Sequence, residues 1–106
     1  MATRGGRLVN PTERQYMREM AVTHADFYRI LPRALQGYDY TSANHEVVAT
    51  VAAGRVVISL GEELVRRIAL VAIPYCEVRF DYQDLDDTDY LKFREQFELY
   101  FRRGGG

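Results

Sequence analysis

The 106-residue chain has one cysteine, Cys76, so it can form neither an internal disulfide nor a metal site built on paired cysteines. Disulfides are typical of oxidising compartments and rare in the reducing cytoplasm. The low cysteine content therefore predicts a cytoplasmic protein.

Long apolar runs are also missing. The longest, at residues 68–75 (IALVAIPY), is much shorter than the roughly 20 residues that a membrane-spanning helix needs. The first fifteen residues contain arginines but no apolar segment of the kind found in a secretory signal. We expect no membrane partner and no export.

A net excess of one charge is absent as well. The 14 Lys and Arg residues nearly balance the 15 Asp and Glu residues, so no global field attracts nucleic acid, and we expect none as a partner. The charge is uneven along the chain, because residues 1–35 hold six Arg and three acids whereas residues 80–106 hold seven acids and four bases. Such asymmetry indicates either a solvated surface or a means of orienting two copies or a partner.

Recognisable catalytic and metal-binding motifs are missing. No Ser, Cys or Lys lies in a nucleophile turn, and the glycines form neither a phosphate loop nor a dinucleotide fingerprint. His24 and Asp26 could be imagined as a metal-binding or acid–base pair, but at this spacing on a helix their side chains would point about 200° apart. The five aspartates of residues 81–90 lack the glycine and glutamate of an EF-hand loop. The sequence favours a non-catalytic protein without cofactor or metal.

The chain does have enough apolar content for one core, since 47% of its residues are hydrophobic. We expect a mobile arm over residues 1–9, a single α+β domain over 10–103, and a flexible glycine tail over 104–106.

Two short helices are predicted before the sheet. Residues 10–20 begin with Asn10 and Pro11, which suit a helix start, and place Tyr16, Met17 and Met20 on one face. The second helix has Thr23 as its cap, Pro32 as a residue that should kink or end it near Leu31, and Gly37 as its closing turn. Its apolar stripe comprises Phe27, Ile30, Leu31 and Leu35.

From Tyr38 the apolar period changes to two, which predicts an antiparallel sheet of four to five strands. Gly54 indicates a hairpin at residues 52–55. Residues 62–67 (EELVRR) fit either a helical turn or an extended strand. Pro74 marks a bend or a sheet edge. The clearest strand covers residues 76–82, whose apolar and charged residues alternate.

A C-terminal amphipathic helix is predicted to cover the sheet, with Asp86 or Asp87 at its cap. Its aromatic stripe indicates core packing, or alternatively a stacking surface for a ligand. The stripe comprises Tyr90, Phe93, Phe97, Tyr100 and Phe101.

The middle of the sheet is expected to be apolar on both faces, because residues 47–52, 56–60 and 68–73 do not alternate with polar residues. Three arrangements could cover the second face. Helices could lie on both faces, or a second copy could pack there in a symmetric dimer. A small apolar or anionic molecule could instead sit in a cup between the sheet and the last helix. The rim of that cup would be Tyr38, Tyr40, Tyr82 and Arg79.

Two main functions follow. The first is a small binding or adaptor module that acts as a homodimer through its sheet, with Arg66, Arg67, Arg102 and Arg103 as exposed recognition points. The second is a small-molecule-binding or enzyme-like protein that uses the cavity between the sheet and the C-terminal helix. A minor alternative is a carrier that uses its C-terminal glycine, although carrier glycines follow a strand of a β-grasp fold and these follow an amphipathic helix.

Overall fold

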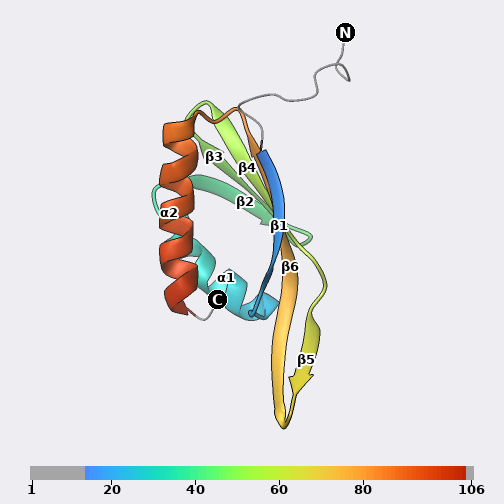
Figure 1. The fold of residues 1–106 in the computed structure, drawn as a ribbon. Helices are drawn as coiled ribbons and strands as arrows, with labels where there is room; N and C mark the ends of the chain where they lie inside the picture. Colours follow the sequence, from blue (N-terminus) through green and yellow to red (C-terminus); the bar gives the residue numbers. More distant parts are fainter. Residues whose placement is uncertain (1–13, 105–106) are drawn as a thin grey trace.

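The structure, a computed structural model, describes residues 14–104, with side chains as far as residue 102 (Figure 1). It has the predicted α+β class, with an antiparallel sheet and a C-terminal helix. The expectations for residues 1–9 and for the end of the tail fall outside the described residues. The elements are β1 (Arg14–Met20), α1 (His24–Ala34), β2 (Asp39–Ala43), β3 (Glu46–Val51), β4 (Gly54–Leu60), β5 (Leu64–Ile68), β6 (Val71–Gln83) and α2 (Asp87–Gly104).

The long strand β6 organises the sheet. The strand order is β1-β6-β4-β3-β2, every pairing is antiparallel, and β5 pairs with the first part of β6. The second part of β6 lies between β1 and β4, whereas residues 71–75 pair with β5 alone. These two strand segments project beyond the helices as a two-stranded hairpin (Figure 1). We call this hairpin, residues 64–75, the extension.

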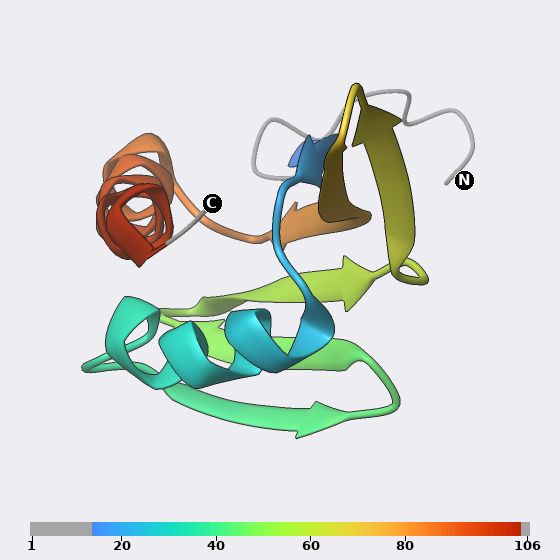
Figure 2. The same ribbon diagram turned by 90° about the horizontal axis from the view of Figure 1, so that it is seen from below.

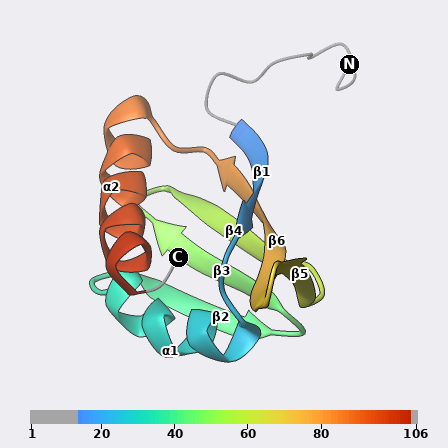
Figure 3. The same cartoon turned by 60° about the horizontal axis from the view of Figure 1, so that its bottom comes forward.

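Both helices cover the same face of the sheet (Figures 2 and 3). They meet through aromatic rings, with the Phe27 ring centroid 4.9 Å from that of Phe101 and 6.4 Å from that of Phe97. The buried hydrophobic side chains of both helices and of β3, β4 and β6 form one cluster. The alternative with helices on both faces of the sheet is therefore wrong.

Helix α1 forms for the predicted reason. The Thr23 hydroxyl accepts a hydrogen bond of 3.0 Å from the backbone N–H of Asp26, and the predicted apolar stripe is buried. The helix does not end at Leu31 but continues to Ala34, because the N–H of Leu35 bonds the carbonyl of Leu31 at 2.9 Å and spans Pro32. Gly37 closes the following turn with φ +91°, a conformation that favours glycine.

The prediction of a helix at residues 14–20 is wrong, since these residues form strand β1. Alternate side chains of β1 are more buried, and Met20 at its end is fully buried. Pairing with β6 from Arg14↔Tyr82 to Met20↔Cys76 supplies a full ladder of backbone hydrogen bonds. That long-range pairing overrides the local helix signals. Consequently Met17, expected beside Tyr16 on one helix face, points to the opposite face and is exposed.

The expectation of a sheet that is apolar on both faces is also wrong. On the face away from the helices, the half-buried Val48 and Val57 are cross-strand neighbours, but one flanking row is Thr50, Arg55 and Gln83. The other flanking row is Glu46, Ser59, Arg79 and Met17. Residues 68–73 are not a continuous strand either, because Ala69 and Leu70 form the turn between β5 and β6. The apolar residues expected at the sheet centre therefore lie partly on the extension.

Helix α2 confirms the core-packing interpretation of its aromatic stripe. Asp86 caps it, since one of its carboxylate oxygens accepts a hydrogen bond of 2.8 Å from the N–H of Asp89. The rings of Phe93, Phe97 and Phe101 are buried and pack on each other and on the sheet. These rings fill the space between α2 and the sheet.

We expect Phe97→Ala to lower the free energy of unfolding by about 3–5 kcal/mol, because it opens a cavity beside the rings of Phe80 and Phe93. Urea denaturation followed by circular dichroism measures the loss. Lys92→Ala on the exposed side of the same helix is the matched control and should change stability by less than about 0.5 kcal/mol. Equal stability of the Phe97→Ala variant and the wild type would contradict the core assignment.

Candidate functional site

The extension gathers most of the exposed large hydrophobic side chains of the described residues. Eight large hydrophobic side chains of the described residues are exposed, and five of them lie on the extension. Among these five, Val65, Ile68 and Val71 are each more than half exposed. Leu70 at the turn is fully exposed. Monomeric proteins rarely expose apolar side chains in such a concentrated group, and groups of this kind mark interaction sites. The extension is therefore the leading candidate for a contact with another molecule.

Both faces of the extension are largely apolar. Cross-strand partners share a face, so Leu64 lies beside Tyr75 and Ile68 beside Val71 on one side. The opposite side carries Val65, next to Pro74. Each face also holds one arginine, namely Arg66 on the first and Arg67 on the second.

The extension also has two free edges. Within the described residues, β5 pairs only with β6, and residues 71–75 of β6 pair only with β5. An isolated two-stranded hairpin is at best marginally stable in water, and unpaired strand edges are templates for pairing with another chain. The free edges and the apolar faces point to the same use.

Contacts to β1 hold the middle of the extension in place. The Arg66 guanidinium donates a hydrogen bond of 3.0 Å to the carboxylate of Glu19 and lies 4.3 Å from the centroid of the Tyr75 ring. The hydrogen bond to Glu19 is the main cause of a raised pKa at Arg66. One of the two predicted recognition arginines thus also orients the extension.

A second set of contacts, which involves histidines, fastens the base of the extension to α1. The backbone N–H of His24 donates to the Glu63 carboxylate at 2.9 Å. His24 Nε2 lies 2.7 Å from the Gly61 carbonyl oxygen, which can only accept, so this nitrogen carries a proton. His24 Nδ1 lies 3.8 Å from the Glu63 carboxylate, and the centroid of the His45 ring lies 4.7 Å from that of His24, with the two rings tilted by 42°. Sequence reasoning missed this cluster because its members come from three separate segments.

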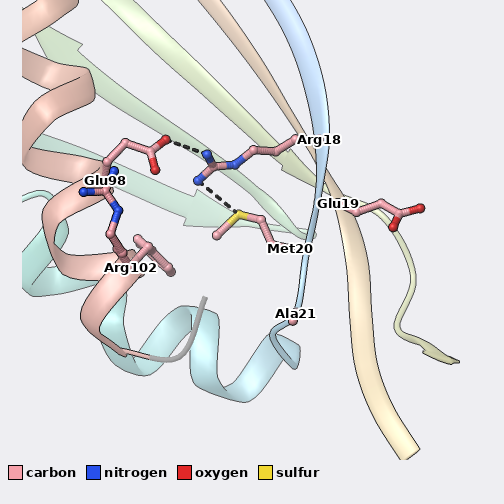
Figure 4. Close-up of a pocket in the computed structure, with 7 residues that line it drawn as sticks. Arg18, Glu19, Met20, Ala21, Glu98 and Arg102 are labelled. Atoms are coloured by element: carbon pink, nitrogen blue, oxygen red, sulfur yellow. Dashed lines mark hydrogen bonds and ion pairs between the residues drawn. The ribbon is translucent and has the colours of Figure 1, made fainter. Parts of the chain in front are cut away.

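Arginines and tyrosines also line the boundary between β1 and α2, which we call the seam. Arg14 lies 4.0 Å from the Tyr90 ring centroid, and Arg94 donates to the Tyr90 hydroxyl at 3.2 Å. At the other end, Arg18 forms an ion pair of 2.6 Å with Glu98 beside a pocket of about 350 Å³ (Figure 4). The seam brings together cations from two elements that are distant in the sequence.

The structure does not bring the predicted cup residues together. Tyr82 is buried in the core, where burial raises the pKa of its phenol, and Arg79 lies on the opposite face of the sheet beside Met17. Tyr38 packs on the Phe93 ring, and Tyr40 lies on β2. The four residues therefore form no common rim.

The predicted recognition arginines are also separated. Arg66 and Arg67 lie on opposite faces of the extension. Arg102 lies on α2 and lines the pocket at the seam. The side chain of Arg103 is outside the described residues. The three arginines whose side chains are described therefore belong to two distinct places, the extension and the seam.

Cys76 is fully buried under the helices, and burial raises the pKa of its thiol. The protonated, enclosed thiol is a poor nucleophile. Among residues 14–104, no three His, Cys, Asp or Glu side chains are placed to hold a metal ion, and neither helix is long and apolar enough to cross a membrane.

Comparisons of this chain with protein-family models, with curated proteins and with solved structures give no match. Its function is therefore inferred from its own geometry alone.

We expect His24→Ala to loosen the base of the extension by about 1 kcal/mol, because it removes the side-chain hydrogen bond to Gly61. Hydrogen exchange followed by mass spectrometry measures this at the Gly61 amide, which bonds the Glu77 carbonyl at 2.7 Å. The matched control is His45→Ala, which removes the neighbouring ring but none of these hydrogen bonds. Unchanged exchange at Gly61 in the His24→Ala variant would show that the histidine does not hold the extension.

Proposed function

We propose that the protein is a small non-catalytic binding or adaptor module that acts as a homodimer through its sheet, with the extension as the contact. The observation that carries the proposal is the concentration of exposed aliphatic side chains on a hairpin with two free edges. On the outer sheet face, the largely polar rows that flank Val48 and Val57 do not favour face-to-face packing. Edge-to-edge pairing of two extensions continues the sheet from one copy into the next.

The charge pattern of β5 and the residues before it favours a second copy as the partner. Acidic Glu62 and Glu63 lie at the base of the extension, and basic Arg66 and Arg67 lie further along it. Antiparallel pairing of two β5 strands about a two-fold axis places the base of one beside the outer part of the other. Acids then face arginines at both ends of the interface, whereas parallel pairing would align like charges.

One register fits these charges well. Centred on Val65, the pairing places Val65 opposite its copy and Glu63 opposite Arg67 of the second copy. Centring on Arg66 would place two arginines directly opposite each other, which destabilises a strand pair. Centring on Leu64 would pair Glu62 with Arg66 but would place Arg67 opposite Gly61, where it faces no acid.

We expect Val65→Cys to form a disulfide-linked dimer under mild oxidation, because the proposed two-fold axis brings the two introduced thiols together. Non-reducing electrophoresis measures the yield. The natural Cys76 can stay in place, since it is buried. Leu70→Cys, at the exposed turn and away from the axis, is the control for random collision. Equal yields from the two variants would contradict the register.

We expect the charge reversal Arg67→Glu to weaken the dimer by about tenfold, because it places like charges across the interface. The second substitution Glu63→Arg in the same chain should restore the opposite signs and recover most of the affinity. Dilution experiments with light scattering measure both dissociation constants. Because Glu63 also accepts a hydrogen bond from His24, the Glu63→Arg single variant is measured as well. If the double variant is weaker than both single variants, the proposed pairing of these two positions is wrong.

A further inference from the structure

The seam holds more positive charge than its neighbouring carboxylates balance. Its cations are Arg14, Arg18, Arg94 and Arg102, and its acids are Asp87 and Glu98. Asp87 pairs with the first of these arginines and Glu98 with the second. Glu95, the next acid on α2, forms no ion pair among the described residues. Two guanidinium groups therefore have no carboxylate partner within the described part of the chain.

Some guanidinium donors in the seam are enclosed but have no acceptor. Arg14 Nη1 and Arg18 Nε are buried and make no hydrogen bond among the described residues. Buried donors in native proteins almost always have a partner, so an unpaired one calls for an explanation such as an absent ion or ligand. Of these two arginines, Arg18 is the one that lines the pocket.

The pocket beside Arg18 combines this charge with an apolar lining. Arg18 crosses from β1 toward Glu98 on α2, Arg102 lies next to Glu98, and Glu19 points away from the pocket (Figure 4). Buried Met20 and Phe101 complete the lining, together with Ala21. The volume of about 350 Å³ lies within the usual size of a small-molecule site.

We propose that this pocket binds a small oxyanion, a carboxylate or a phosphate monoester, that carries a compact apolar group. The anion would take the place of Glu98 as the partner of Arg18, whose planar guanidinium can donate two parallel hydrogen bonds. Arg102 supplies the second positive charge, and Met20 and Phe101 contact the apolar group. This site lies on the side of β1 that faces α2, so it does not depend on the proposed dimer.

Titration with benzoate and with phenyl phosphate, followed by two-dimensional ¹H–¹⁵N nuclear magnetic resonance, tests the proposal. We expect saturable shifts in the signals of residues 18–21 and 98–102 with at least one probe, and the tighter probe identifies the head group. Arg18→Gln should weaken binding about tenfold, because one charged hydrogen-bonding group is lost. Glu98→Gln should tighten binding, since it removes the competing carboxylate, a result that a purely structural role of Arg18 does not predict.

The control variant is Arg29→Gln, which removes an exposed arginine on α1 and should leave the affinity unchanged. If Arg18→Gln fails to fold, Arg102→Gln, which breaks no ion pair of the described residues, takes its place. Absence of saturation with both probes overturns the proposal, and so does equal weakening by Arg29→Gln. Inorganic phosphate that binds as tightly as phenyl phosphate would overturn the assignment of the apolar contacts.

Discussion

The pairing of β6 with three other strands is the constraint on which the rest of the structure depends. Its second part lies between β1 and β4 and places the buried residues from Cys76 to Tyr82 under both helices. The same register turns Arg14 and Arg18 toward α2 and so creates the seam. The pairing of β6 with β1 starts at Cys76 and its pairing with β4 at Val78, so residues 71–75 of β6 have only β5 to pair with. The core, the seam and the extension thus follow from the length and register of one strand.

The sequence predicted the elements whose signals are local. The Thr23 cap and the stripe of α1, the alternation of residues 76–82 and the aromatic face of α2 all correspond to observed structure. The strand at residues 14–20 could not be predicted, because its partner lies near the other end of the chain while nearby residues carry helix-start signals. The turn at Ala69 and Leu70 was also missed, since no glycine, proline or asparagine marks it and Ala69 adopts φ 56°.

The candidate sites were predictable only in part. Arg66 and Arg67 were expected to be exposed recognition residues, and the structure places both on the extension, where their use in binding stays a prediction. The contacts of His24 with Gly61 and Glu63, and the seam itself, could not be found in the sequence, because each joins residues that only the fold brings together. No spacing rule connects such residues.

The central claim is that the extension joins two copies of this chain. Sedimentation velocity of the wild type and of a Val65→Asp variant, over the same micromolar concentration series, tests it most directly. We predict that the wild type shifts from monomer to dimer as its concentration rises, whereas the variant stays a monomer because a charge at the two-fold axis opposes pairing. A wild type that remains a monomer throughout, or a variant that dimerises equally well, would contradict the account.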